Sequence, residues 1–280
     1  MHKSLLLAVF VGTFTAEAQV LEIPPRKHDA PTGSEFAASV RDLPTDEREK
    51  QIFGQIAGGN VPAFLRHLVP VSALSADSQH TLTYYVTPDY LAIGSDEDYL
   101  LIPMTPILAQ AIADTTRCSL PTKKMVNDIY QAASLKLAPQ PIPPSAAMIT
   151  TGVFVQHNDS VWRQRSPLLS KFPLGVLVGG HKKDVILSNS IRTNLKPGVP
   201  RPVVIYGWHR LDGTPIQPPY NGHGGSYADY SHGIRLVQQE MMLDGRKVQM
   251  DSVLRNPALC GLLSDEGMID TPRYDTARKE

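Results

Sequence analysis

A proline-rich segment lies at the middle of the chain, where four of the eight residues from Ala138 to Ser145 are proline. Proline fixes the backbone φ angle and removes an amide donor, so we expect this segment to form a rigid connection. The chain contains 24 prolines in total, which predicts many turns and irregular connections elsewhere. We therefore expect an α+β fold, with helices before residue 138 and strands after residue 147.

Capping and hydrophobic patterns predict short helices in the N-terminal half. Asp46 and Glu49 resemble a capping box for a helix that ends before Gly58-Gly59. Thr105-Pro106 combines an N-cap residue with proline at the first helical position, which starts another helix. A third helix carries an apolar stripe at Val126, Ile129, Tyr130 and Ala133. This stripe needs a partner, so we expect the sheet to pack against it.

Short apolar runs predict strands on both sides of the connection. The β-branched and aromatic run Thr81–Val86 is followed by two more runs around the acidic turn at 95–98, which indicates a small antiparallel sheet. The C-terminal half contains the runs Met148–Gln156, Leu174–Val178, Val185–Leu187, Val203–Trp208, Ile234–Val237 and Lys247–Met250. Asp-Gly pairs at 212–213 and 244–245 have hairpin chemistry. We expect one mainly antiparallel sheet in this half.

The N-terminus resembles a secretory signal over residues 1–18. It has Lys3, an apolar run from Leu5 to Phe14, and small residues around Ala18. The mature chain is then expected to start at Gln19 and to be secreted or periplasmic.

The rest of the chain predicts one domain between two mobile ends. We expect a mobile leader over 19–41, a single α+β domain over 42–269 and a mobile tail over 270–280. No run in the mature chain reaches the length of a membrane span, so no integral membrane segment is expected. Lys+Arg and Asp+Glu are equal at 27 each, and no basic run is interleaved with aromatic residues, so nucleic acid is not an expected partner.

A polar and aromatic segment ends in a histidine just before the apolar run Ile234–Val237. A glycine-dense loop with a second histidine precedes this segment. Aromatic faces beside hydrogen-bond donors suit sugar rings, and tyrosine with histidine can serve as acid and base. The predicted substrate-binding residues are Trp208, His223, Tyr227, Asp229 and Tyr230, around a catalytic His232.

Cys118 is the candidate nucleophile. It is expected just outside the N-terminus of the helix that carries the apolar stripe, where the helix dipole and Arg117 favour a thiolate. Thiol catalysis also needs an imidazole within hydrogen-bond reach, and the two residues can be far apart in sequence. His232 is the expected base.

These residues resemble the NlpC/P60-type papain-like peptidases. Cys118-Ser119 before the apolar stripe is similar to the Cys-Ser helix of that family, and Ser231–Val237 before an Asp-Gly hairpin is similar to its histidine strand. The resemblance implies a papain-like fold and a cysteine that attacks an amide bond of a cell-wall peptide without a cofactor. It also implies that a polar residue on the next strand, Gln249 here, orients the imidazole of His232.

Two alternatives stay open. A metal-dependent hydrolase is one, with ligands drawn from His181, Asp184, His209, His223, Asp229 and His232, although their spacing matches no zinc motif. A noncatalytic extracellular protein that binds a glycan partner is the other. It would be stabilised by a disulfide between Cys118 and Cys260, the two cysteines of the chain.

Overall fold

The computed structural model describes residues 19–193, 195, 197–198 and 200–276. The expected signal segment over residues 1–18 lies outside the described residues. The α-helices are α1 (Gly33–Ser39), α2 (Thr45–Ala57), α3 (Pro106–Thr115), α4 (Lys123–Ala132), α5 (Thr151–Arg165) and α6 (Met250–Leu254). Helices and antiparallel strands are both well represented, so the predicted α+β class is confirmed.

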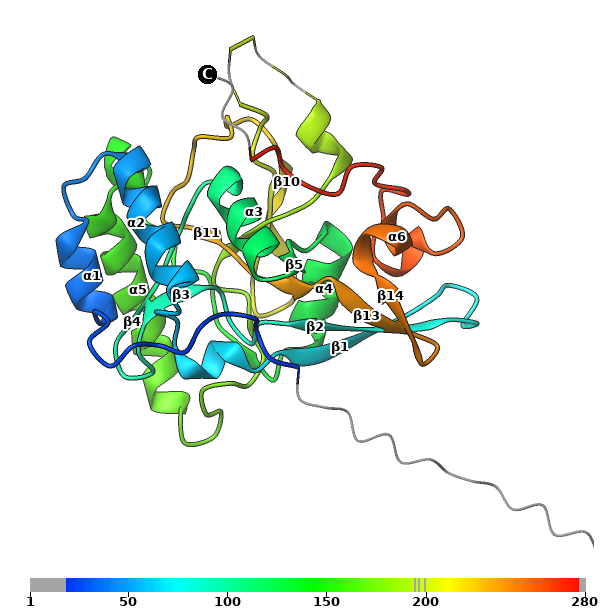
Figure 1. Cartoon of the computed structure of the whole chain (residues 1–280), viewed down its shortest axis with the longest axis horizontal. Coiled ribbons are helices and arrows are strands. Elements are labelled where there is room, and N and C mark those ends of the chain that lie inside the picture. The colour runs from blue at the N-terminus through cyan, green and yellow to red at the C-terminus, as the bar shows by residue number, and fades with distance from the viewer. Residues whose placement is uncertain (1–18, 194, 196, 199, 277–280) are drawn as a thin grey trace, which may run out of the picture.

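The strands form two main sheets and two strand pairs (Figure 1). The six-stranded sheet contains β1 (Val69–Leu74), β2 (Thr81–Val86), β5 (Cys118–Ser119), β12 (Val237–Gln238), β13 (Glu240–Leu243) and β14 (Arg246–Gln249). The four-stranded sheet has the order β10 (Pro215–Tyr220), β9 (Ile205–His209), β8 (Lys183–Val185) and β11 (His232–Gly233). The pairs are β3 (Ala92–Gly94) with β4 (Tyr99–Leu101), and β6 (Leu135–Lys136) with β7 (Val178–Gly179).

Elements with strong local signals form where the sequence predicts them. Thr105 and Thr122 cap α3 and α4 through their side chains, and α4 buries its apolar stripe against β1, β7 and β9. Asp244 and Gly245 both have positive φ at the tip of the β13–β14 hairpin, as a tight two-residue turn requires.

The predicted strand at 148–156 is wrong, because residues 148 and 149 end a 3-10 helix and residues 151–156 begin α5. The buried residues of α5 recur every three or four positions, at Thr151, Phe154, His157, Val161 and Arg165. This burial stabilises a helix despite the β-branched residues at its start, since tertiary packing overrides local propensity.

Strands and helices alternate along the chain, so the connection at 138–145 does not separate a helical half from a β half. β1 and β2 precede it and pair, directly or through β2, with strands that follow it. The buried apolar residues on both sides of the connection form one core. The strands after residue 147 are also divided between sheets. Residues 234–236 of the predicted strand at 234–237 connect β11 to β12, and Val237 begins β12.

The predicted mobile leader and tail are wrong for the residues that the structure describes. Leu21 is buried, Val20 forms a β-bridge with His67, and Thr32 starts α1 with a capping box. Near the other end, Tyr274 is buried and its hydroxyl donates to the Ile186 carbonyl. Both segments therefore belong to the folded unit. None of the described helices is long and apolar enough to cross a membrane.

Candidate functional site

The parallel pairing of β8 with β11 sets the position of the central histidine. In this register His232 lies beside Lys183, and Gly233 lies beside Asp184. Alternate residues of a strand point to opposite faces, so Lys183 and Asp184 serve different sides of the sheet. Gly233 is required here, because an added Cβ would lie 2.6 Å from both Tyr90 Cδ1 and Lys182 Cβ.

We define the His232 cluster as His223, Tyr227, Asp229, His232 and Lys183. Asp229 lies in a tight turn just before β11. Its Oδ1 atom accepts hydrogen bonds from the Ser231 backbone N–H at 2.8 Å and from the Ser231 hydroxyl at 2.5 Å. The Tyr227 hydroxyl donates to Asp229 Oδ2 at 3.1 Å. The predicted residues of this segment therefore lie together.

His232 is fully buried, and neither of its ring nitrogens has a hydrogen-bond partner among the described residues. Burial lowers the pKa of His232 to about 4, although the Asp229 carboxylate opposes this shift. The imidazole is therefore neutral at pH 7. Buried polar atoms without partners are rare in folded proteins, and a catalytic role or a bound water is among their explanations. The ring nitrogens of His157 and His181 are in the same state.

Asp229 is the charged neighbour of His232. Burial raises its pKa, but the His232 ring and the hydrogen bonds from Ser231 outweigh burial and hold the pKa of Asp229 below its ordinary value. Asp229 is thus ionised at neutral pH. It can stabilise an imidazolium form of His232 whenever the ring accepts a proton.

Two aromatic rings cover this pair. The His223 and Tyr227 rings stack with their centroids 4.0 Å apart, and the Tyr227 ring lies edge-on to His232 at 5.8 Å. Burial, followed by the Asp229 charge, raises the pKa of Tyr227, so its hydroxyl stays protonated. His223 and Tyr227 are both partly exposed, so this side of the cluster faces solvent.

Two lysines of the loop and strand around β8 approach the same cluster. Lys182 is buried and donates to the Tyr230 carbonyl at 2.6 Å, and burial lowers the pKa of Lys182 to about 7. Lys183 is partly exposed, and its ammonium lies 4.9 Å from the centre of the Trp208 ring. Burial also lowers the pKa of Lys183, against the attraction of Asp229.

Trp208 and Tyr230 support the site from within the core, so the structure does not support their predicted role in binding substrate directly. Both are buried and form a small apolar cluster with Phe154. Trp208 Nε1 donates to the His181 carbonyl at 3.2 Å. The Tyr230 hydroxyl bonds to the backbone of Ile142 in the proline-rich connection, which fixes that connection against the site.

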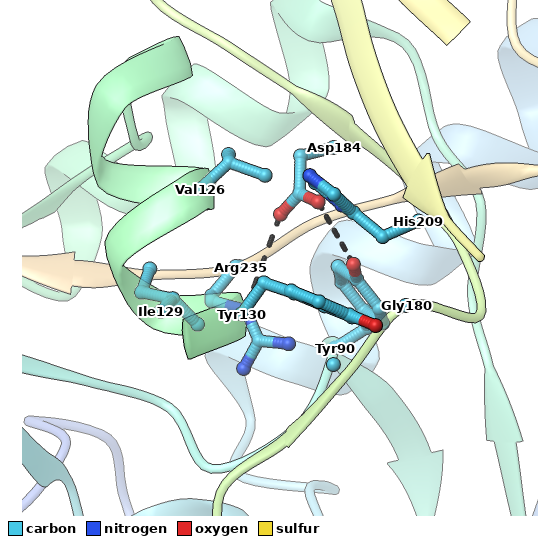
Figure 2. Close-up of a pocket in the computed structure, with 9 residues that line it drawn as sticks. Tyr90, Val126, Ile129, Tyr130, Gly180, Asp184, His209 and Arg235 are labelled. Atoms are coloured by element: carbon cyan, nitrogen blue, oxygen red, sulfur yellow. Dashed lines mark hydrogen bonds and ion pairs between the residues drawn. The ribbon is translucent and has the colours of Figure 1, made fainter. Parts of the chain in front are cut away.

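A second buried group, the Asp184 cluster, consists of Tyr90, Asp184, His209 and Arg235 (Figure 2). The Tyr90 hydroxyl donates to Asp184 Oδ2 at 2.8 Å, and Arg235 Nε lies 4.0 Å from Asp184 Oδ1. Figure 2 shows these side chains around a cavity beside α4. The cavity volume is about 10 Å³, about the space that one water molecule needs.

The charges of the Asp184 cluster balance one another. Arg235 donates to the Thr87 and Val178 carbonyls at 2.8 and 2.7 Å, which holds its guanidinium in place. Burial raises the pKa of Asp184 to about 6, against the attraction of Arg235. Nearby, Asp89 lies 3.1 Å from His181 Nε2, at ion-pair distance but without hydrogen-bond alignment. This network is part of the folded core.

Sequence reasoning missed Asp89 and Tyr90 in this network, and it missed the buried His157 of α5. His157 lies against Tyr230, with the ring centroids 5.0 Å apart. The available signal is the position of Asp89 and Tyr90 directly after the strand at 81–86. For His157, the signal is its place on the apolar face of a helix, which is visible only once α5 is recognised.

The six residues of the metal alternative do not converge on one point. His181 pairs with Asp89, Asp184 with Tyr90, and His209 Nε2 with Asn127 at 3.1 Å. Among the described histidines, cysteines and carboxylates, no group of three or more has an arrangement that could hold a metal ion.

The predicted thiolate at Cys118 is wrong. Cys118 lies in β5, four residues before the cap Thr122, and its thiol is 2% exposed and donates to the Thr116 carbonyl. Burial raises the pKa of Cys118 to about 12, so the thiol is protonated at neutral pH. Cys118 is opposite Gln238 in the six-stranded sheet, whereas His232 lies in the other sheet. The structure does not support this pair as a nucleophile and its base.

The other predictions tied to Cys118 also fail. Gln249 is exposed on β14, opposite Glu240, so the structure does not support it as the residue that orients His232. Asp229 is the polar neighbour instead. The predicted disulfide is wrong, because Cys118 and Cys260 are both free, and Cys260 faces the Pro257 carbonyl.

For the hydrolysis proposed below, Cys118→Ala is expected to keep turnover within about twofold of the wild type. The reason is that a buried, protonated thiol supplies no nucleophile. Turnover of the variant and the reaction of native protein with iodoacetamide at pH 7.5 check this prediction. A loss of activity beyond about 100-fold in a folded variant would contradict it.

The buried histidines make stability depend on pH. The folded pKa values of His209 and His232 are about 4, below the ordinary value of 6.5, so the unfolded chain binds more protons between these limits. Their contribution is complete above pH 6.5 and is lost as pH falls towards 4. The effect of Asp184 on stability has the opposite sign, because its folded pKa of about 6 exceeds its ordinary value of 3.8. Its contribution offsets that of one histidine.

We therefore expect the urea midpoint of unfolding to fall between pH 6.5 and pH 4. Burial also lowers the pKa of His157, so three buried histidines contribute to this fall. His209→Gln should reduce the fall, because one of these contributions is removed. Urea titrations at half-unit pH intervals measure both effects. A midpoint that rises on acidification, or an equally steep fall in His209→Gln, would contradict this assignment.

Comparison of this chain with protein-family models, curated proteins and solved structures finds no match. The NlpC/P60 resemblance of the sequence therefore stays a prediction. The functional conclusion below depends on the His232 cluster.

Proposed function

We propose that the chain is a hydrolase in which His232 acts as a general base on water. One observation carries this proposal: a fully buried, neutral imidazole with two unbonded ring nitrogens lies beside an ionised Asp229. A positioned general base contributes about 10²- to 10⁴-fold to a reaction rate. Cys118 has no role in this reaction.

The proposed reaction uses His232 in both of its steps. The imidazole takes a proton from water as the water oxygen bonds to the scissile carbon, and Asp229 stabilises the imidazolium that forms. The bond from that carbon to the leaving group then breaks, and the imidazolium returns the proton to the leaving atom. Tyr227 holds Asp229 in position through its hydrogen bond.

The proposed substrate is a cell-wall peptide or glycan outside the cytoplasm. The sequence resemblance and the signal-like N-terminus motivate this choice. Entry from the side of His223 and Tyr227 is consistent with it, because these two rings are the partly exposed aromatic members of the cluster. Aromatic faces beside polar groups suit sugars and peptide bonds.

The test is incubation of purified protein with peptidoglycan, followed by separate measurement of new amino groups and new reducing ends. New amino groups indicate hydrolysis of an amide bond, and new reducing ends indicate hydrolysis of a glycosidic bond. Heat-denatured protein serves as the control. Neither product above this control, at micromolar protein over several hours, would reject the proposed substrate.

A further inference from the structure

Lys183 is the partly exposed cation of the His232 cluster. The register of β8 with β11 fixes it beside His232, and its ammonium lies over Trp208 rather than against a carboxylate. Among the described residues, no Asp or Glu lies within ion-pair distance of Lys183. Burial lowers its pKa, which means that lost hydration disfavours the charge. An anion bound to the Lys183 ammonium would replace the hydration that burial removes.

The chemistry of the surroundings favours a carboxylate over a phosphate. Lys183 offers one point charge on a flexible stem, which can pair with a carboxylate or with a phosphate, so the neighbouring charge decides between them. Asp229 is near enough to affect the pKa of Lys183, and it would repel a dianion more strongly than a monoanion. The Asp229 oxygens accept hydrogen bonds from Ser231 and Tyr227, and among the described residues they form no ion pair with Lys183.

From these observations we infer that Lys183, whose ammonium lies over the face of Trp208, binds a carboxylate of the substrate and positions the neighbouring bond against His232. This inference rests on the proposed function and adds a substrate class, a polymer with a free carboxylate next to the bond that is cleaved. In a cell wall the carboxylate can belong to an N-acetylmuramic acid residue or to the end of a peptide.

Binding measurements without turnover test the inference. The probes are N-acetylmuramic acid and N-acetyl-D-alanyl-D-alanine, each compared with its carboxamide at pH 7 and low salt. Calorimetry on wild-type protein should show that at least one acid binds tenfold or more tightly than its amide. Which acid binds identifies the source of the carboxylate. Equal binding of acid and amide in both pairs would overturn the inference.

Three variants separate the charge from the packing. Lys183→Met should remove the preference for the acid, and Lys183→Arg should recover part of it. Lys136→Met is the matched control, because Lys136 also lies over an aromatic ring, 4.8 Å from the centre of Tyr130, and makes no described contact with the His232 cluster. It should bind as the wild type does. An unchanged preference in Lys183→Met would overturn the inference.

The same titrations on His232→Gln distinguish the inference from the proposed function. If this variant loses turnover and keeps the preference for the acid, both are supported. Full turnover with the preference retained would reject His232 as the base and leave the carboxylate site. Lost turnover without any preference for the acid in the wild type would reject the site alone.

Discussion

His232→Gln is expected to lower turnover of the proposed cell-wall substrate by about 10²- to 10⁴-fold, the usual contribution of a general base. Glutamine has a similar length and can form hydrogen bonds, but it cannot accept a proton at neutral pH. The fall should appear mainly in kcat, because His232 lies behind Tyr227 and His223 and acts on water. Initial rates over a range of substrate concentrations measure it.

His209→Gln is the matched control for that experiment. His209 also lies at the end of a strand, and burial also lowers its pKa to about 4, but it belongs to the Asp184 cluster and bonds to Asn127. We expect its turnover to stay within about threefold of the wild type. Equal losses in both variants would show that the fold, rather than a base at His232, controls the rate.

Arg235→Met is expected to lower the free energy of unfolding by about 3–5 kcal/mol, the cost of removing one partner of a buried charge pair. Arg235 is 1% exposed, donates to two carbonyl groups and lies over the Tyr90 ring at 4.5 Å. Its loss removes the charged partner of Asp184, which keeps only the Tyr90 hydrogen bond, and leaves both carbonyls without the guanidinium. Urea unfolding followed by circular dichroism measures the change.

Arg255→Met is the control for Arg235→Met. Arg255 pairs with Asp251 at 3.1 Å one turn away, and its side chain is 49% exposed. Exposed pairs of this kind contribute about 0–1 kcal/mol, so this variant should unfold close to the wild type. A change below about 1 kcal/mol in Arg235→Met would contradict the structural role of the Asp184 cluster.

Features that depend on neighbouring residues could be predicted from the sequence. The threonine cap of α3, the stripe of α4, strand β2 and the Asp-Gly hairpins depend on a few consecutive residues. The segment from Tyr227 to His232 is another such feature, because one turn brings its side chains together. Local chemistry was sufficient in each case.

Features that depend on distant partners could not be predicted in this way. The start of α5 has β-branched residues that favour a strand, and only burial of its periodic face makes it helical. Cys118 has the flanking residues of a reactive thiol, but pairing of β5 with β12 buries it. Asp89 and Tyr90 meet His181 and Asp184 across more than 90 residues, without any local motif.

The central claim is that His232 is a neutral imidazole, and NMR titration of its ring measures this directly. In protein labelled with ¹⁵N at histidine, the His232 resonances are assigned as those missing from His232→Gln. We predict that the ring is neutral from pH 8 to pH 5 and is protonated with a midpoint near pH 4. A midpoint at or above pH 6.5 would show a solvated or ion-paired ring and would contradict this account.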